Sequence, residues 1–242
     1  MELKMTKSLI RILGLAAIAA LPQLSTAQDK PADASTNSPP ARRRFASIAR
    51  GADQPAPRTD KNSLLAHEEL VAKAKKGGID IYFEGDSITR RWGTSDYQWR
   101  SNLENWNSNF FGWNAADFGW GADSTQHILW RLEHGELDGV NPKIIVLLAG
   151  INNVGTFPGG DEKVANITHG LQAIVKVMQE KAPNAVIILT GLFPRNDNMS
   201  VIPEINKIND NRANFADGKK SRYINGNGRR ADENGKLYRG RT

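Results

Sequence analysis

Cysteine is absent from the 242-residue chain, and histidine is scarce. The lack of cysteine excludes disulfides, thiolate zinc sites and cysteine nucleophiles. No two histidines stand four residues apart, the spacing that places a metal-binding pair on one face of a helix. The four histidines are His67, His127, His134 and His169. We therefore expect no metal site.

Apolar runs long enough to cross a membrane are also lacking after the start of the chain. Residues 1–27 have the pattern of a secretory signal peptide: a basic start, an apolar stretch over residues 12–24, and small residues before the cleavage point. An uncleaved membrane anchor is the alternative interpretation. Cleavage and export would make the mature protein secreted or periplasmic, with no membrane span.

Acidic residues are only slightly fewer than basic residues in the chain. The formal net charge is +6, and the basic residues form no stripe interleaved with aromatic residues. Such a stripe would indicate nucleic-acid binding. We therefore interpret the excess as a solvated basic surface and expect no nucleic-acid partner.

The chain after the leader divides into a linker and one domain. Residues 28–59 are rich in Pro, Ala, Ser and Arg and lack apolar periodicity, which predicts a disordered linker. The domain is expected over residues 60–242, beginning with a helix that ends at Gly77 and Gly78.

Short apolar runs alternate with helical segments along the domain. The runs expected as strands are residues 79–84, 115–119, 143–149, 185–190 and 222–225. Helical periodicity marks residues 124–132, 161–181 and 203–216. This alternation predicts an α/β three-layer sandwich with a roughly five-stranded parallel sheet, covered on both faces. In such sheets, sites form at the carboxyl ends of strands.

Three of the expected strand ends carry residues suited to one reaction. Ser87 follows the first strand, the loop around Ala122 follows the second, and Asn152 follows the third. A serine hydroxyl becomes a nucleophile when a base takes its proton. Backbone N–H groups and an Asn amide can stabilise the resulting oxyanion. Each feature alone has a simpler interpretation as a turn or helix cap, but together they indicate acyl transfer.

Four blocks at these positions resemble the SGNH (GDSL-type) serine hydrolases. The blocks are FEGDSITRRWG, DFGWGADSTQHILWRLEHGELDG, PKIIVLLAGINN and LTGLFPR. They are most similar to the branch of platelet-activating-factor acetylhydrolase catalytic subunits and bacterial acetyl-esterases. The resemblance implies a flavodoxin-like fold and a serine esterase for short acyl groups, especially acetyl, that needs no cofactor.

The resemblance also implies roles for individual residues. Ser87 would be the nucleophile, and Asn152 and the backbone N–H of Ala122 would be oxyanion donors. Ala122 stands where the family usually has glycine, so its methyl group could narrow the pocket or tilt that N–H. The family does not use the GxSxG elbow of α/β-hydrolases, and here Thr89 occupies the position of the final glycine.

The family's Asp-x-x-His block, which supplies the base and its partner, does not occur after Arg222. We expect the last helix of the fold to be missing as well, and this chain to be weakly active or inactive. None of the four histidines is expected to substitute as the base.

A second hypothesis is a non-catalytic binding module for acylated glycans, since the pocket could persist without its base. A flavodoxin-like nucleotide binder is disfavoured, because the chain has neither a GxxxxGK[ST] loop nor a GxGxxG fingerprint. For the esterase, the expected substrate is a small acyl ester or an acetylated carbohydrate. Acyl chain length and oligomeric state stay open.

Overall fold

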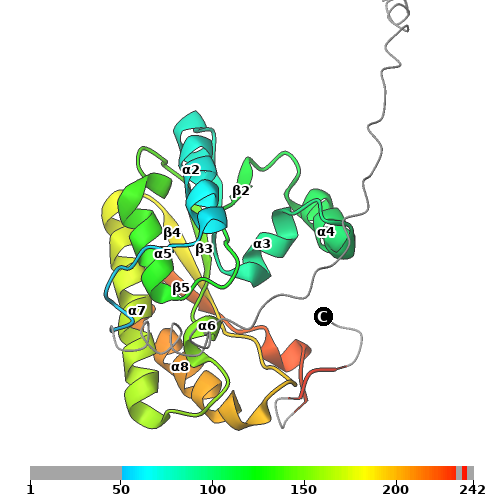
Figure 1. Ribbon diagram of the computed structural model, residues 1–242, viewed down its shortest axis with the longest axis vertical. Coiled ribbons are helices and arrows are strands. Elements are labelled where there is room, and N and C mark those ends of the chain that lie inside the picture. Colours follow the sequence, from blue (N-terminus) through cyan, green and yellow to red (C-terminus); the bar gives the residue numbers. More distant parts are fainter. Residues whose placement is uncertain (1–50, 233–235, 239–242) are drawn as a thin grey trace, which may run out of the picture. The chain divides into compact units, whose positions relative to one another are not determined.

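Five strands form a single parallel sheet in the computed structural model, which describes residues 51–232 and 236–238 (Figure 1). Their order is β2-β1-β3-β4-β5, and every neighbouring pair is parallel. The strands are β1 (Ile81–Gly85), β2 (Ala115–Asp117), β3 (Ile144–Leu148), β4 (Val186–Thr190) and β5 (Ser221–Ile224). The predicted α/β class and the five-stranded sheet are confirmed.

Helices follow the strands on both faces of the sheet. Figure 1 shows α5, α7 and α8 on one side and α3 and α4 on the other. The α-helices are α2 (Lys61–Lys76), α3 (Ser87–Gly93), α4 (Arg100–Phe110), α5 (Thr125–Arg131), α6 (Ile151–Val154), α7 (Gly160–Lys181) and α8 (Ile202–Phe215). The shorter turns are η1 (Tyr97–Trp99), the π-helical η2 (Leu132–Glu136), η3 (Met199–Val201) and η4 (Asn227–Arg229).

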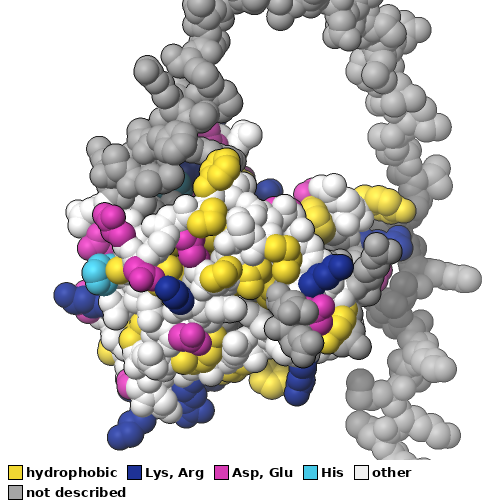
Figure 2. All heavy atoms as spheres, turned by 90° about the horizontal axis from the view of Figure 1, so that it is seen from below, with side chains coloured by type: hydrophobic (Ala, Val, Ile, Leu, Met, Phe, Trp, Pro, Cys, Tyr) yellow, Lys and Arg dark blue, Asp and Glu magenta, His cyan; other side chains and the backbone are white. Residues whose placement is uncertain are grey.

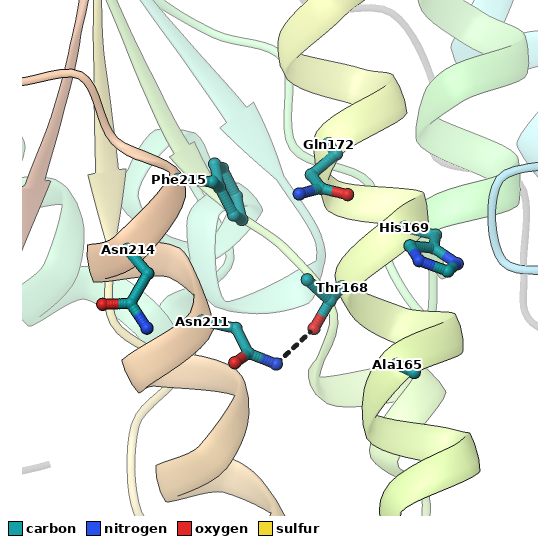
Figure 3. A pocket seen from close by; sticks show the side chains of 7 residues that line it. All are labelled: Ala165, Thr168, His169, Gln172, Asn211, Asn214 and Phe215. Carbon is teal, nitrogen blue, oxygen red and sulfur yellow. Dashed lines mark hydrogen bonds between the residues drawn. The ribbon is translucent and has the colours of Figure 1, made fainter.

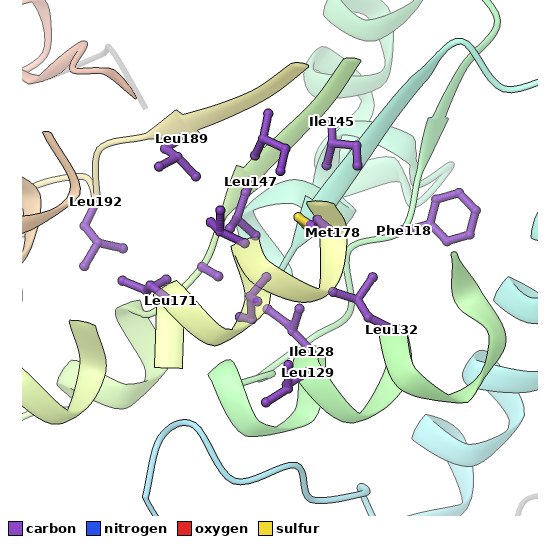
Figure 4. Packing of buried hydrophobic residues seen from close by; sticks show 14 of the residues in the cluster. Phe118, Ile128, Leu129, Leu132, Ile145, Leu147, Leu171, Met178, Leu189 and Leu192 are labelled. Carbon is purple, nitrogen blue, oxygen red and sulfur yellow. The ribbon is translucent and has the colours of Figure 1, made fainter. Parts of the chain in front are cut away.

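The main core lies between the sheet and helices α5 and α7. Ile145 and Leu147 of β3 point toward Met178 of α7, and all three side chains are at most 1% exposed (Figure 4). The apolar stripe of α7 supplies this layer because residues three and four apart share a helix face. Leu70 and Ala74 of α2 belong to the same cluster.

The opposite face of the sheet is covered unevenly. Over β1, the ring of Phe83 contacts Trp106 and Phe110 of α4, with centroids 5.0 and 4.9 Å apart. Further along the same face Ile188 of β4 is only half-buried, and Ile224 of β5 is 53% exposed. Within residues 225–232 and 236–238 only η4 follows β5 as a helical turn. This part of the sheet face is therefore less covered than the part over β1.

Three α-helices, α3, α4 and the short α6, lie where the sequence analysis predicted none. Helix α3 starts at Ser87 with Asp86 as its N-cap, and α4 follows at residues 100–110. Helix α4 has no fully buried residue and carries many asparagines, so its apolar stripe is weak. It is held by the packing of a few aromatic side chains, a tertiary contact that periodicity does not report.

The last residues of the predicted linker belong to the folded unit. Ala52 is fully buried; its N–H donates to Asn166 Oδ1 at 2.8 Å, and its carbonyl accepts from Thr125 Oγ1 at 2.8 Å. These are backbone bonds to side chains of α7 and α5, so residues 51–59 pack on the domain without any apolar periodicity. The boundary at residue 60 is therefore too late.

The predicted signal peptide and the rest of the predicted linker, residues 28–50, lie outside the described residues. Of the helices in residues 51–232 and 236–238, none has the length and apolarity needed for a membrane span.

Candidate active site

Ser87 lies at the junction between β1 and α3. Asp86 caps the helix by accepting a hydrogen bond from the backbone N–H of Ile88 at 2.9 Å. Gly85 is required just before it, because a Cβ there would lie 2.4 Å from the carbonyl oxygen of Leu148 on β3. The close contact between strands therefore fixes where Ser87 leaves the sheet.

The loop after β2 lies directly against this junction. A Cβ on Gly119 would lie 2.5 Å from the backbone nitrogen of Arg90 and 2.9 Å from the carbonyl oxygen of Asp86. The N–H of Trp120 donates to the carbonyl of Gly85 at 3.1 Å. The glycine allows backbone to approach backbone here, and the approach brings the loop beside Ser87.

Ala122 adopts a left-handed conformation with φ of 62°. This region is strained for residues with a Cβ and costs them roughly 1–2 kcal/mol. A glycine would adopt it without strain, which gives a physical reason for the glycine usually found at this position in the resemblance described above. Ala122 is exposed to solvent.

Asn152 is carried by α6, directly after β3. Its Nδ2 donates to the carbonyl of Asp123 at 2.7 Å, which ties it to the loop of Ala122. An amide nitrogen has two hydrogens, so a second donor remains. In the order β2-β1-β3, Ser87 leaves the strand that lies between the strands of the other two residues. The structure thus brings the three predicted residues to adjacent strand ends.

Asn153 is a further polar residue at this edge. Its Oδ1 accepts from the backbone N–H of Thr125 at 2.9 Å, and its Nδ2 donates to Gln126 Oε1 at 2.9 Å. It therefore holds the start of α5 against the end of β3. In the sequence analysis only its neighbour Asn152 was assigned a role, although both belong to the same GINN segment.

Asp86, next to Ser87, is a buried carboxylic acid. Burial raises its pKa to about 6, although the hydrogen bond from the Ile88 N–H opposes this rise. Its Oδ2 has no hydrogen-bond partner, while Oδ1 caps α3. This side chain therefore titrates near pH 6, closer to neutrality than an ordinary aspartate.

No histidine among the described residues is hydrogen-bonded to Ser87. His127 accepts from the backbone N–H of Ser124 at 3.1 Å, and burial lowers its pKa to about 4. His67 pairs with a carboxylate oxygen of Glu136 at 2.7 Å, and His134 contacts the carbonyl of Trp130 at 2.7 Å. His169 is exposed on α7. His127 thus caps the start of α5 together with Ser124.

Within the described part of the chain, no three His, Asp or Glu side chains gather in a way that could hold a metal ion.

The sequence analysis missed a buried cluster of charges beside the site, centred on Arg131. Its members were invisible to pattern analysis because they are spread over three elements; they are Glu84, Asp123, Arg131 and Glu136.

A separate hollow of about 340 Å³ lies between α7 and α8 (Figure 3). It contains none of the three predicted site residues; its lining consists of Ala165, Thr168, His169, Gln172, Asn211, Asn214 and Phe215. Figure 2 shows the molecule from below, the side on which α6 lies in Figure 1, and hydrophobic side chains gather in the middle of that face.

A parallel sheet with a serine at one strand end and polar donors at the two adjacent ends defines a class of α/β proteins built for acyl chemistry. The family model of the GDSL-like lipase/acylhydrolases matches residues 83–241. The chain belongs to this family, and the resemblance found in its sequence is confirmed.

Curated relatives carry the same likeness. The chain is 32% identical over 148 residues to platelet-activating factor acetylhydrolase IB subunit alpha1 of Bos taurus, an alignment that covers 61% of this chain and 58% of that protein. It is 34% identical over 152 residues to the alpha2 subunit of Gallus gallus, with 62% and 60% covered. The match thus spans about three fifths of these relatives' length.

Solved structures support the fold. A Bacteroides fragilis protein provisionally described as an acylhydrolase superposes with a TM-score of 0.56 at 17% identity, covering 76% of this chain and 87% of that one. A protein of Streptococcus pneumonia, provisionally described as a platelet activating factor, gives a TM-score of 0.55 at 20% identity, covering 74% and 83%.

Proposed function

We propose that this protein is an exported serine esterase that hydrolyses short-chain acyl esters, acetyl esters above all. The observation that carries the proposal is the meeting of Ser87, the Ala122 loop and Asn152 at the ends of three adjacent strands, joined by the bond from Asn152 to Asp123. Family membership and the acetylhydrolase relatives support the reaction class.

The proposed reaction proceeds through an acyl-enzyme. The Ser87 oxygen attacks the ester carbonyl carbon while a base accepts its proton. The backbone N–H groups of Ser87 and Ala122, with the free hydrogen of the Asn152 amide, hold the oxyanion of the tetrahedral intermediate. The alcohol then leaves with a proton, and water releases the acyl group as a carboxylic acid.

A base for Ser87 is not among the contacts of the described histidines. Because no described histidine contacts Ser87, we expect these residues alone to turn over slowly. Residual catalysis from an oxyanion hole and binding amounts to roughly 10³–10⁴-fold over water in serine hydrolases that have lost their triad. The chain is therefore proposed to be impaired rather than inert.

The central test is hydrolysis of p-nitrophenyl acetate by the full chain, by Ser87→Ala and by Asn152→Ala. Without an added base, the full chain and Ser87→Ala should both keep only the residual rate of an oxyanion hole and binding. With imidazole as a soluble base, the full chain should turn over faster than Ser87→Ala. Asn152→Ala should lower kcat roughly 10²–10³-fold, the usual effect of removing one oxyanion donor. Equal rates for the full chain and Ser87→Ala in the presence of imidazole would refute the assignment.

The missing base can be tested separately by chemical rescue. Added imidazole should accelerate the full chain more than it accelerates Ser87→Ala, because a soluble base can then take the Ser87 proton. Butyryl and octanoyl esters tested in the same way should react more slowly than acetyl if short chains are preferred.

A binding module for acylated glycans is the second candidate, favoured by the lack of a histidine at Ser87. It predicts no Ser87-dependent hydrolysis with or without imidazole, together with binding of an acetylated polysaccharide that is lost on deacetylation. Export is tested by expression with the native leader: an extracytoplasmic product starting at Gln28 supports it, and a full-length chain in the membrane fraction contradicts it.

A further inference from the structure

Arg131, near the end of α5, lies at the centre of a buried cluster beside the candidate site. The residue is 3% exposed. Its Nε donates to Asp123 Oδ2 at 2.8 Å, its Nη2 to Glu84 Oε1 at 2.7 Å, and its Nη1 to the carbonyl of Phe118 at 3.1 Å. Nη1 also bonds Glu136 Oε2. A single side chain therefore links three elements of the fold.

Two of these contacts fix the loop that carries Ala122. Phe118 stands at the start of this loop, and Asp123 directly follows Ala122. Arg131 thus holds the loop on both sides of Ala122. Arg58 adds a second cation on the outer side, with its Nη1 3.3 Å from Asp123 Oδ1 and 3.0 Å from the carbonyl of Gly121.

A third contact joins the loop to the strand of Ser87. Glu84 belongs to β1, and its Oε1 accepts both from Arg131 and from the backbone N–H of Gly85, the latter at 3.0 Å. Gly85 lies two residues before Ser87. Glu84 therefore connects the backbone just before Ser87 to the same guanidinium that holds the loop of Ala122.

Asp123 extends this linkage to the third strand end. Its carboxylate accepts from Arg131, while its carbonyl accepts from Asn152 Nδ2 at 2.7 Å. The strand before Ser87, the loop of Ala122 and the side chain of Asn152 are therefore all linked, directly or through one residue, to Arg131.

We infer that Arg131 is a positioning residue that sets the distance between the Ser87 strand, the Ala122 loop and Asn152. The expected effect of Arg131 on the reaction of Ser87 rests on the proposed function, whereas its effect on the loop of Ala122 does not. The planar guanidinium presents five N–H donors in a fixed fork, so it can serve four acceptors at once. A lysine has the charge but not the fork.

Burial and charge agree with this role. Burial lowers the pKa of an arginine, but the carboxylates of Glu84, Glu136 and Asp123 together raise that of Arg131 well above its ordinary value. The guanidinium is therefore charged at every pH at which the protein is folded. Buried ion pairs contribute little stability compared with apolar packing, but they can fix a specific arrangement.

The experiment compares Arg131→Met, Arg131→Lys and a control, Met178→Ala, by hydrogen–deuterium exchange well below their melting temperatures. Met178 is fully buried on α7, so its truncation weakens the core without touching the cluster. In both Arg131 variants, the amides of residues 118–124 should exchange about tenfold faster or more, because the loop opens locally. In Met178→Ala they should exchange as in the wild type.

The second readout is the rate at which a fluorophosphonate labels Ser87 with imidazole present as a soluble base, identified by mass spectrometry. Arg131→Met should lower this rate about 10²-fold, the size of effect that a small misplacement of reacting groups produces. Met178→Ala should stay within about twofold of the wild type. In turnover of p-nitrophenyl acetate, kcat should fall in Arg131→Met while KM changes little, since only the oxyanion geometry is lost.

Each outcome decides the inference. Unchanged exchange of the loop in both Arg131 variants, or a change equal to that in Met178→Ala, overturns it. If Arg131→Met does not fold, Asp123→Asn keeps the shape of the cluster but weakens its bond to Arg131, and it should raise loop exchange in the same direction. If the wild type itself is not labelled at Ser87, the proposed function fails, while the exchange data still decide the role of Arg131.

Discussion

Two arginines are buried among residues 51–232 and 236–238, and their surroundings are opposite. Arg131 is bonded to the carboxylates of Glu84, Asp123 and Glu136. Arg212 of α8, 1% exposed, donates only to backbone carbonyls, those of Ala149 after β3 and Thr190 at the end of β4. The guanidinium of Arg131 neutralises acidic side chains, whereas that of Arg212 donates hydrogen bonds to backbone carbonyls at the ends of two strands.

The pKa values follow from this difference. Carboxylates raise the pKa of Arg131 against the effect of burial. Burial lowers the pKa of Arg212 to about 10, and Tyr223 and Asp86 oppose this only in part. The comparison teaches that a buried arginine can serve as a counter-ion or as a cap for backbone carbonyls, with different consequences when it is removed. The following predictions test that contrast.

The largest effect is expected for Arg131→Met. The change leaves three acidic side chains around an apolar group, and breaking a buried ion pair in this way costs about 4 kcal/mol. Urea unfolding followed by circular dichroism at pH 7 measures the loss. A loss below about 1 kcal/mol would show that the carboxylates readily find other partners or protons.

A smaller loss of about 3 kcal/mol is expected for Arg212→Met. This change deprives two buried carbonyls of a donor but leaves no unpaired ion, and each unsatisfied polar group costs roughly 1–3 kcal/mol. The same urea titration measures it. If Arg212→Met proves more destabilising than Arg131→Met, the contrast between the two arginines is contradicted.

The free energy of unfolding should also depend on pH, because Glu84 is buried. Burial raises the pKa of Glu84 to about 8, although Arg131 opposes this rise and Glu136 adds to it. The folded state then holds a proton that the unfolded state releases above pH 4.5, so Glu84 contributes stability that is fully present below pH 4.5 and is lost as the pH rises toward 8. The free energy of unfolding should fall by about 1 kcal/mol per pH unit in this range.

Glu84→Gln should remove that part of the slope, because glutamine resembles the protonated acid and does not titrate. Urea unfolding between pH 5 and pH 8 is the measurement. Asp117, whose pKa burial raises to about 7, adds a slope of the same sign and stays in the variant as an internal reference. Identical slopes in the wild type and Glu84→Gln would contradict a protonated Glu84 in the Arg131 cluster.

The smallest effect is expected for Ala122→Gly, in the loop held by Arg131. Replacing Ala122 by glycine removes the strain of the left-handed conformation, roughly 1–2 kcal/mol. The greater chain entropy of glycine in the unfolded state offsets part of this gain. The variant should therefore be more stable by roughly 0.5–1 kcal/mol. Thermal melts measure this gain. Ala115→Gly, in an extended strand, is the matched control and should lose stability. A loss in Ala122→Gly would mean that the loop conformation is not strained.

The sequence was sufficient for the sheet, because strands depend on short-range patterns, and it named three candidate site residues at the strand ends. Buried strands appear as apolar runs such as residues 143–149, and α7 appears as a 3.6-residue stripe. Ser87 and Asn152 could be found because they directly follow such runs. Helix α4 could not, because it is held by aromatic contacts of Trp106 and Phe110 with Phe83 and Trp92, which leave no periodic signal in the sequence.

By itself the sequence determined the fold class, the five strands and the identity of Ser87, Ala122 and Asn152 as candidates. Only the tertiary structure decided how they are held together: Arg131 reaches Glu84 across 47 positions, and Ala52 reaches Asn166 across 114. Hydrogen bonds and charge pairs between distant residues leave no periodic signal in the chain. They form only once the sheet has brought the strand ends side by side.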